Sequence, residues 1–212
     1  MKKINVFMVD DHELILEGIR KTLSLFPEIV ITGEARSAEE LHGEAVDKSA
    51  DIILLDIDLP GRSGFEALAD VKTLFPRARV LFLSMFPEDQ FAVRALKAGA
   101  HGYVTKKAVA QELVDAIRTI AAGKKYLSPG VEQQLLQEIG YNRERSPLET
   151  LSDRELSVLR LIAKGKSAGA IASQLSLSVN TVTTYRRRLL KKLDMKTNAE
   201  LVRFALENRI II

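Results

Sequence analysis

Two kinds of hydrophobic pattern alternate along the first 122 residues. Five nearly continuous runs rich in Val, Ile and Leu are typical of strands that are covered on both faces. These runs lie at Ile4–Val9, Ile29–Ala35, Ile52–Asp56, Val80–Ser84 and Gly102–Thr105. Between them apolar residues recur at helical spacing, as at Leu14, Leu16, Ile19 and Leu23. The strand–helix repeats predict an α/β domain with a doubly wound five-stranded parallel sheet and right-handed crossovers.

From Leu151 onward the pattern is helical throughout. Ser152 with Glu155 predicts a capping box, in which each side chain accepts from the other residue's backbone N–H. Further helices are predicted at about Ser167–Leu175, Val179–Leu193 and Ala199–Asn208. The chain therefore divides into an α/β domain, a linker with a short helix and a small all-α domain, over residues 1–122, 123–147 and 148–212.

Local signals add detail to this division. Ser128-Pro129 can start the short helix of the linker, which ends near Gly140, because proline suits the first helical position. The polar stretch Tyr141–Thr150 is typical of a flexible linker. In the first domain, Ser37–Glu40 has the form of another capping box.

The composition is that of a globular protein. Of the 212 residues, 46% are hydrophobic and 28% are charged, which excludes a chain that is disordered throughout. Cysteine is absent, which excludes a disulfide or a thiolate metal site. The histidines His12, His42 and His101 lack the spacing of a metal cluster, and we interpret His12 and His101 as surface or capping residues. No run has the length of a secretory signal or a membrane span, so we expect a soluble cytoplasmic protein without a membrane partner.

The net charge of +3 hides an asymmetry. Residues 1–122 carry 15 Lys and Arg against 19 Asp and Glu, a net charge of −4. Residues 146–212 carry 12 basic residues against 6 acidic ones, a net charge of +6. Basicity of this size in a short domain favours a polyanionic partner such as nucleic acid, and a solvated charged surface is the alternative.

Three carboxylates lie at the carboxyl ends of predicted strands. Asp10 and Asp11 follow the first strand, and Asp56 stands at the end of the third. In an open parallel sheet, ligands bind at these ends, near the point where the strand order reverses. Converging carboxylates repel one another, and a hard cation such as Mg²⁺ compensates them. For any one Asp, capping of the following helix is the plainer interpretation.

A hydroxyl and an ammonium group reach the same edge of the predicted sheet. Ser84 ends the fourth strand, and Lys106 follows the fifth. Oxygen ligands, a lysine and a hydroxyl around one carboxylate are typical of a phosphoryl-transfer site. Helix capping alone is a poor explanation for so many such residues on the ends of neighbouring strands.

Residues 1–122 resemble the receiver domain of two-component response regulators. The matching segments are Val9-Asp10-Asp11, Leu55–Pro60 with Gly64, Val80–Ser84 and Gly102–Lys106. The resemblance implies a flavodoxin-like sheet with the strand order 2-1-3-4-5. It also implies that Asp56 is the phosphoacceptor for a sensor histidine kinase, and that the protein assists its own phosphorylation without being a turnover enzyme.

The same resemblance implies roles for the rest of the pocket. The groups that hold Mg²⁺ are the side chains of Asp11 and Asp56, the backbone carbonyl of Asp58 and, through water, Asp10. Ser84 and Lys106 bind the phosphoryl oxygens. Tyr103 occupies the position of an aromatic switch that turns inward when the hydroxyl residue moves, and a half-buried strand aromatic is the alternative.

The segment Ser167–Leu193 has helix–turn–helix form, and Ser178 can cap its second helix. On that helix Val182, Leu189 and Leu193 share one side, and the opposite side is polar and basic, as a recognition helix in the major groove requires. The residues expected to contact DNA are Asn180, Thr183, Thr184, Arg187, Arg188 and Lys191, with Arg186 and Lys192 on the DNA backbone. A solvated charged helix face is the alternative.

This part of the chain resembles the LuxR-type DNA-binding domain. The matching residues include Leu151-Ser152, Gly165, Thr181-Val182 and Ala199–Val202. The order of the two domains is similar to that of the NarL/FixJ class of response regulators. The resemblance implies a transcription regulator that binds double-stranded promoter DNA and forms a homodimer on phosphorylation or DNA binding.

The last predicted helix offers a dimer face. One side packs inward through Leu201, Phe204 and Ala205. The side that remains for a partner carries Glu200, Val202, Arg203 and Glu207. A single small helical domain offers little interface, so we expect two copies on adjacent half-sites.

Two other function classes fit parts of the pattern. Asp56-Ile57-Asp58 resembles the DxD motif of haloacid-dehalogenase-like phosphatases, but Pro60-Gly61 stands where those enzymes usually have Thr or Val, and a later acidic pair is missing. A regulator that works through protein contacts without phosphate is the other alternative. A phosphatase turns over a phosphate ester steadily, whereas a receiver gains one phosphoryl group.

Overall fold

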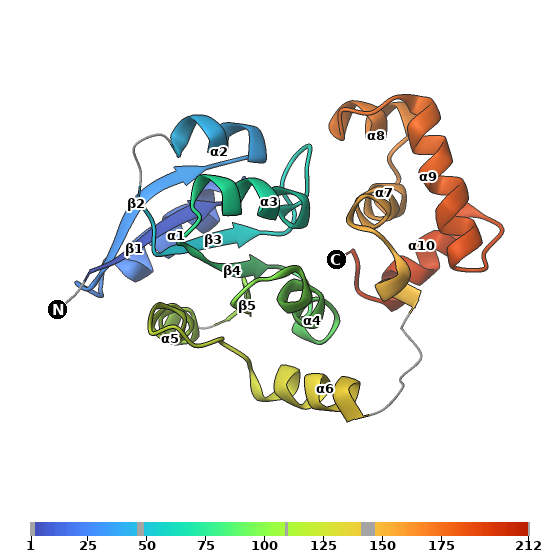
Figure 1. Cartoon of the computed structure of the whole chain (residues 1–212). Helices are drawn as coiled ribbons and strands as arrows, with labels where there is room; N and C mark the ends of the chain where they lie inside the picture. The colour runs from blue at the N-terminus through green and yellow to red at the C-terminus, as the bar shows by residue number, and fades with distance from the viewer. Residues whose placement is uncertain (1–2, 46–48, 109, 141–146, 212) are drawn as a thin grey trace. The chain divides into compact units, whose positions relative to one another are not determined.

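The computed structural model describes residues 3–45, 49–108, 110–140 and 147–211. The chain divides into two compact units, Met1–Tyr141 and Asn142–Ile212 (Figure 1). All strands among the described residues belong to the first unit, and the second unit is helical. None of the helices in these residues has the length and apolar character needed to cross a membrane.

The first unit is built on a five-stranded parallel sheet. Its strands are β1 (Ile4–Val9), β2 (Ile29–Ala35), β3 (Ile52–Asp56), β4 (Arg79–Ser84) and β5 (Gly102–Thr105). They are hydrogen-bonded in the order β2-β1-β3-β4-β5, which confirms the predicted flavodoxin-like fold. Because β1 and β3 are neighbours, with Val9 beside Leu55, the residues that follow them meet at one edge of the sheet.

Helices cover both faces of this sheet. They are α1 (Glu13–Leu23), α2 (Ala38–Glu44), α3 (Gly64–Leu74), α4 (Glu88–Ala98) and α5 (Ala110–Ala121). On one face α1 and α5 share a core with β1, β3 and β4, in which Leu16 and Ile117 are fully buried. On the other face Phe65 of α3 packs against Phe82 of β4, with 4.9 Å between ring centroids. The strands are thus covered on both sides, as their continuous hydrophobicity predicts.

The helix caps follow the local sequence, with one difference. Ser63 and Glu66 form a complete capping box at the start of α3. The box predicted at Ser37 is only half formed. The Ser37 hydroxyl accepts from the N–H of Glu40, but the Glu40 carboxylate accepts from the N–H of Arg36 and not from that of Ser37. The Glu40 carboxylate therefore accepts from the backbone N–H of the residue before the N-cap Ser37.

The segment after α5 packs on the first unit. Its helix α6 (Pro129–Gly140) contacts α4, and Val131 at its start is buried. Before α6, the N–H of Tyr126 donates to the carbonyl of His101 at 2.9 Å, which joins this segment to the sheet beside β5. The part of the predicted linker that ends at Gly140 therefore lies with the first unit.

The flexible linker predicted at Tyr141–Thr150 is described only in part. Residues 141–146 lie outside the described residues. Pro147–Thr150 forms a short 3-10 helix, η1, whose Thr150 hydroxyl donates to the carbonyl of Pro147 at 2.7 Å. The end of the predicted linker therefore forms one turn of 3-10 helix, which the hydrogen bond from Thr150 to Pro147 closes.

The second unit packs short helices around a small core. These helices are α7 (Asp153–Ala163), α8 (Ala168–Gln174), α9 (Val179–Lys192) and α10 (Asn198–Glu207). The predicted capping box of Ser152 and Glu155 is present at the start of α7. α7 packs against α9 and α10, and each of these three helices contributes a fully buried leucine: Leu159, Leu189 and Leu201.

Candidate functional site

The carboxyl ends of the strands bring an acidic pocket together in the first unit. Asp10 and Asp56 are only 3% and 2% exposed. The ammonium Nζ of Lys106, which follows β5, lies 2.6 Å from Oδ2 of Asp10 and 2.8 Å from Oδ2 of Asp56. The strand order produces this contact, because it places the ends of β1 and β3 side by side within reach of the lysine after β5.

Burial and the charges of neighbouring groups shift the pKa values of Asp56 and Lys106. Burial raises the pKa of Asp56 to about 6, with a further contribution from Asp10 and an opposing one from Lys106. Burial by itself lowers the pKa of Lys106, but the two carboxylates outweigh it, and the net shift is upward. Lys106 therefore stays charged. One ammonium group faces two buried carboxylates, so the pocket is short of positive charge.

The oxygens on the other side of these carboxylates are suited to a cation. Oδ1 of Asp56 is buried and has no hydrogen-bond partner among the described residues. Ligating atoms of Asp10, Asp11, His12 and Asp56 lie within 4.8 Å of one another. Carboxylate oxygens with a deficit of positive charge fit a hard divalent cation such as Mg²⁺. The predicted ligand set of Asp11, Asp56, the backbone carbonyl of Asp58 and, through water, Asp10 stays a prediction.

The loop after β3 approaches Asp56 closely from behind. The N–H of Gly64 donates to the carbonyl of Ile57 at 2.9 Å. A Cβ on Gly64 would lie 2.0 Å from the backbone oxygen of Asp56, so no larger residue fits without a backbone shift. In the same loop Gly61 has a φ of +74°, in the left-handed region that glycine tolerates. Both glycines therefore shape the loop that positions the carboxylate.

Ser84 and Tyr103 are joined through Phe86, in the loop after β4. The Ser84 hydroxyl accepts from the N–H of Phe86 at 3.2 Å, and the Tyr103 hydroxyl donates to the carbonyl of Phe86 at 2.9 Å. Tyr103 is 1% exposed, and burial raises the pKa of its hydroxyl, which keeps it a donor. Tyr103 is therefore not a half-buried strand aromatic, because its side chain is turned fully inward.

His12 is an exposed N-cap residue, as the sequence predicts, whereas His101 is partly buried. His12 is the N-cap residue of α1, but its side chain makes no capping hydrogen bond. Its Nδ1 lies instead 2.8 Å from Oδ1 of Asp11 and 3.1 Å from Oδ1 of Asp10. His101 is partly buried, accepts from the N–H of Val80 at 3.2 Å, and has a pKa lowered by burial. The sequence signal for His12 is its place directly after two carboxylates in a strand-to-helix turn.

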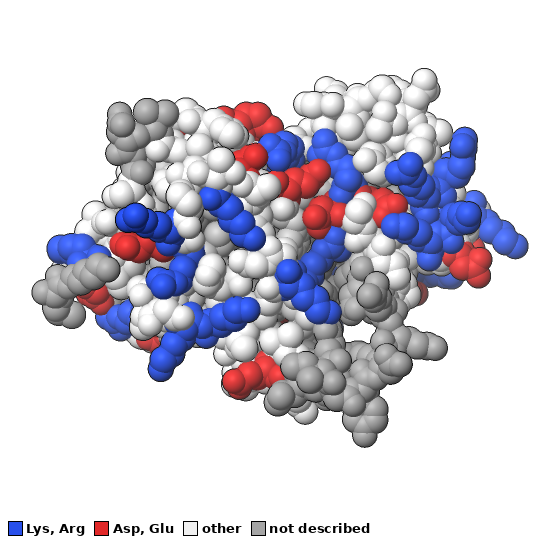
Figure 2. Space-filling view, in the orientation of Figure 1, with Lys and Arg blue, Asp and Glu red and all other residues white. Residues whose placement is uncertain are grey.

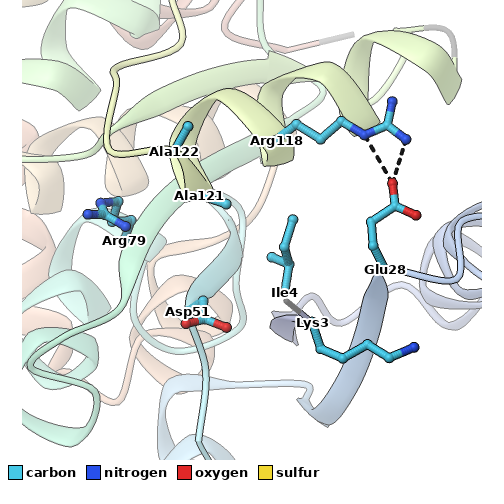
Figure 3. A pocket seen from close by; sticks show the side chains of 8 residues that line it. All are labelled: Lys3, Ile4, Glu28, Asp51, Arg79, Arg118, Ala121 and Ala122. Atoms are coloured by element: carbon cyan, nitrogen blue, oxygen red, sulfur yellow. Dashed lines mark hydrogen bonds and ion pairs between the residues drawn. The ribbon is translucent and has the colours of Figure 1, made fainter. Parts of the chain in front are cut away.

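A cavity of about 620 Å³ lies at the opposite, amino end of the strands (Figure 3). Its lining residues are Lys3, Ile4, Glu28, Asp51, Arg79, Arg118, Ala121 and Ala122. Arg118 donates to Oε1 of Glu28 at 2.5 Å, and this hydrogen bond lowers the pKa of Glu28. None of these lining residues belongs to the acidic pocket.

The helix–turn–helix of the second unit consists of α8 and α9. The Ser178 hydroxyl caps α9 by accepting from the N–H of Thr181 at 3.0 Å. In the turn before it, Ser176 has a φ of +53°, and the N–H of Leu177 donates to the carbonyl of Ala172 at 2.8 Å. That bond closes the carboxyl end of α8 and directs the chain into the second helix.

α9 has one buried side and one exposed basic side. Val182 and Leu189 are buried. The exposed residues include all six that are predicted to contact DNA: Asn180, Thr183, Thr184, Arg187, Arg188 and Lys191. Figure 2 shows Lys and Arg side chains gathered over this helix. The hydroxyls of Thr183 and Thr184 donate to helix carbonyls one turn back, each at 3.0 Å, so their methyl groups and oxygen lone pairs remain for a ligand.

The two predicted contacts to the DNA backbone are bonded inside the unit. Nζ of Lys192 donates to Oε2 of Glu155 at 2.6 Å and to the carbonyl of Thr150 at 3.0 Å. Because the Glu155 side chain is buried, Lys192 compensates a buried charge, and we assign it to the stability of the unit. Nε of Arg186 donates to Oδ1 of Asn198 at 2.5 Å, which uses one of its nitrogens.

The exposed face of α10 agrees with the predicted one at Arg203 and Glu207 but only partly at Glu200 and Val202. The residues buried on its inner side are Leu201, Phe204 and Ala205. Glu200, predicted to face a partner, completes a capping box with Thr197. Arg203 and Glu207 lie 3.8 Å apart on the exposed side, while Val202 is half-buried. Leu206 is a large apolar residue on the exposed side of this helix, and the helical periodicity does not predict its exposure.

The chain thus combines a parallel sheet with an acidic edge and a separate helix–turn–helix unit. Residues 6–118 match the response regulator receiver domain, and residues 149–205 match the bacterial regulatory proteins of the luxR family. The chain belongs to the response regulators, in the NarL/FixJ class that combines these two domains. It is therefore a DNA-binding transcription regulator and not a turnover enzyme.

Relatives match this chain over nearly its whole length. The response regulator UvrY of Escherichia coli strain K12 is 35% identical over 206 residues, which cover 97% of this chain and 94% of UvrY. The response regulator GacA of Pseudomonas aeruginosa is 35% identical over 209 residues, 98% of each chain.

Solved structures of RcsB from Salmonella are similar to the whole chain. One RcsB structure has a TM-score of 0.77 at 25% identity and covers 98% of this chain and 99% of RcsB. Another, of RcsB bound to promoter P1flhDC in the presence of the phosphomimetic BeF3−, has a TM-score of 0.70 at 26% identity. It covers 99% of this chain and 98% of that one.

Proposed function

We propose that Asp56 accepts a phosphoryl group from a sensor histidine kinase in a Mg²⁺-dependent reaction, and that this modification promotes dimerisation and binding to promoter DNA. The observation that carries the proposal is the asymmetric environment of the Asp56 carboxylate. Lys106 holds one oxygen, while the other is buried without a hydrogen-bond partner among the described residues. A carboxylate held at one oxygen and open at the other is oriented as a nucleophile.

The transfer forms a bond between a carboxylate oxygen of Asp56 and phosphorus and breaks the P–N bond of a phosphohistidine on the kinase. The imidazole nitrogen of the kinase keeps the electron pair of that bond and takes up a proton from solvent. Lys106 and Ser84 supply donors to the phosphoryl oxygens, because each stands at the end of a strand next to the pocket.

The groups that would hold Mg²⁺ are the side chains of Asp11 and Asp56, the backbone carbonyl of Asp58 and, through water, Asp10. When bound, the ion neutralises negative charge on the phosphoryl oxygens. The Asp11 side chain is 35% exposed, whereas that of Asp10 is buried. Access to the site is therefore from the Asp11 side.

The contacts of Phe86 connect the pocket to the surface around α4. Ser84 now accepts a hydrogen bond from the N–H of Phe86. A phosphoryl group on Asp56 draws the Ser84 hydroxyl toward itself and frees that N–H, while Tyr103 still holds the carbonyl of Phe86. Phe86 packs on Phe91 of α4, with 4.8 Å between ring centroids, so the shift reaches α4 and biases a two-state element.

α9 enters the major groove of double-stranded promoter DNA. Arg187 offers paired donors to guanine, and Thr183 and Thr184 offer methyl groups to thymine and lone pairs to base donors. The remaining contacts are those of Asn180, Arg188, Lys191 and the terminal nitrogens of Arg186. Lys192 is 40% exposed and can still donate to a phosphate, although its ammonium is also bonded to Glu155. Contacts to phosphates position the helix, and contacts to bases specify the sequence.

A dimer places two copies of α9 on adjacent half-sites and doubles the contact area of this small unit. RcsB has been solved as dimers on DNA, in a structure with a TM-score of 0.60 at 25% identity. In this chain the exposed side of α10, with Arg203, Leu206 and Glu207, provides an apolar centre flanked by charges of both signs. We propose this side as the dimer face.

Intact-mass measurement after incubation with acetyl phosphate and Mg²⁺ tests the phosphoacceptor. Wild type gains one phosphoryl group, and Asp56→Asn gains none because the nucleophilic oxygen is lost. Asp58→Asn is the matched control, since its proposed role uses only the backbone carbonyl. Equal labelling of wild type and Asp56→Asn rejects the assignment. Steady release of inorganic phosphate over many turnovers identifies a phosphatase instead.

A further inference from the structure

The imidazole of His12 points back toward the acidic pocket. His12 is the N-cap residue of α1, yet its side chain makes no capping hydrogen bond. The side chain is 54% exposed, so packing does not force it onto the carboxylates. Its Nδ1 nevertheless lies 2.8 Å from Oδ1 of Asp11 and 3.1 Å from Oδ1 of Asp10.

The two oxygens of each buried carboxylate have different surroundings. Lys106 lies at ion-pair distance from Oδ2 of both Asp10 and Asp56. Oδ1 of Asp10 accepts from the backbone N–H of His12 at 3.0 Å and lies 3.1 Å from its Nδ1, and Oδ1 of Asp56 has no hydrogen-bond partner among the described residues. Three carboxylate groups and one imidazole nitrogen therefore offer ligand atoms away from the lysine.

The shortest distances among these atoms are those of neighbouring ligands around a single cation, and they are also ordinary hydrogen-bond distances. With metal–ligand bonds of about 2.1 Å, neighbouring ligands of an octahedral ion lie about 3 Å apart, and opposite ligands lie about 4.2 Å apart. The two distances from Nδ1 of His12, 2.8 and 3.1 Å, match the separation of neighbouring ligands. The whole set of ligating atoms lies within 4.8 Å.

We infer that His12 is a further ligand of this cation site and makes it selective for first-row transition ions such as Co²⁺ and Zn²⁺ over Mg²⁺. Mg²⁺ prefers oxygen ligands, whereas imidazole nitrogen suits transition ions. The inference rests on the cation site of the proposed function, which takes oxygen from Asp11 and Asp56. A transition ion that binds there competes with Mg²⁺ and limits the phosphorylation of Asp56.

Titration of the full chain with Co²⁺ and with Mg²⁺ tests this selectivity. Calorimetry gives the two dissociation constants, and the visible absorption of Co²⁺ reports nitrogen coordination. His12→Asn removes the imidazole and keeps a residue that is favourable at an N-cap. We expect the ratio of the Mg²⁺ to the Co²⁺ dissociation constant to fall by about tenfold or more, because a nitrogen ligand of the transition ion is lost.

His42→Asn is the matched control for this experiment. The side chain of His42 is 55% exposed, and its Nε2 lies 3.7 Å from the single carboxylate of Asp70. We expect wild-type selectivity in this variant. An equal loss of affinity for both ions in His12→Asn, or no loss for either, overturns the inference. A wild type that selects Co²⁺ but gains no phosphoryl mass with Mg²⁺ rejects the proposed function and leaves the role of His12 standing.

Discussion

The acidic pocket and the basic side of α9 use charge in opposite ways. In the pocket the side chains of Asp10, Asp56 and Lys106 are buried, and Lys106 lies at ion-pair distance from both carboxylates. On α9, Arg187 and Lys191 are exposed, and neither forms an ion pair with another described residue. The pocket is prepared for one small group at a defined point, whereas the helix presents a solvated surface to an extended polyanion.

The physical basis of this difference is the dielectric environment. Charges in a buried cluster interact strongly and are screened little by salt, so a single change alters the whole cluster. Exposed charges interact weakly with their neighbours and are screened by salt, so each contributes almost independently. Variants in the pocket should therefore change stability, and variants on α9 should change only DNA binding.

Among the variants compared, we expect the largest loss of unfolding free energy when the buried ammonium of Lys106 is removed. Lys106→Met leaves Asp10 and Asp56 facing each other without compensation, and breaking a buried pair costs roughly 3–5 kcal/mol of unfolding free energy. Urea denaturation followed by circular dichroism measures the change. The exposed neighbour gives the control, since Lys107→Met should change the free energy by less than about 0.5 kcal/mol. Equal stability of the two variants would show that Lys106 does not compensate the carboxylates.

Filling the space behind Asp56 should have the next largest effect. In Gly64→Ala the new Cβ overlaps the backbone oxygen of Asp56, and such overpacking costs roughly 1–3 kcal/mol. Because the loop must shift, phosphoryl labelling by acetyl phosphate should fall as well. Gly18→Ala, in a helix position with no atom within 4 Å of the new Cβ, should instead stabilise by up to about 1 kcal/mol. Unchanged labelling of Gly64→Ala would separate the loop from the function of Asp56.

Two substitutions on α9 test the exposed half of the comparison. Arg187→Ala should weaken binding to a specific promoter by roughly 1–3 kcal/mol and leave nonspecific binding nearly unchanged. Lys191→Ala should weaken both alike and reduce the slope of log K against log salt by roughly one. Binding to cognate and scrambled DNA over a salt series measures both effects. Identical behaviour of the two variants on both DNAs would contradict this division of roles.

The smallest expected effect concerns the buried ion pair of the second unit. Burial raises the pKa of Glu155, but hydrogen bonds from Lys192 and Ser152 lower it more, and the net shift is downward from 4.5. A carboxyl with a lowered folded-state pKa adds stability that is complete above its unfolded pKa and is lost as the pH falls through the folded value. We therefore expect the second unit of the wild type to lose stability below about pH 4.5.

Glu155→Gln should show less of this loss on acidification, because the amide does not titrate. Urea titrations at several pH values, followed by the amide NMR signals of α7, measure the stability of the second unit alone. Glu207→Gln, on the exposed side of α10, is the control and should keep the wild-type pH dependence. A wild-type dependence in Glu155→Gln as well would assign the acid sensitivity to another group.

The sequence alone determined the strand bounds, the helix caps and the residues of the acidic pocket. The strands were predictable to within one residue, as β4 illustrates by starting at Arg79 and not at Val80. The caps at Ser152 and Ser178 were equally predictable, because periodicity and capping depend on residues that are close in the chain. The pocket residues could be named in advance because parallel strands end at one edge of the sheet.

Only the tertiary structure decided which partner each charged side chain has. Lys192 has the sequence signature of a phosphate contact, yet the packing of α7 against α9 places it on Glu155, 37 residues away. His12 follows two carboxylates in the sequence, but the turn into α1 is what directs its imidazole back over the pocket. A charged or titratable residue has the same local pattern whether it faces solvent or a buried partner. The choice depends on contacts between distant segments, which local periodicity does not record.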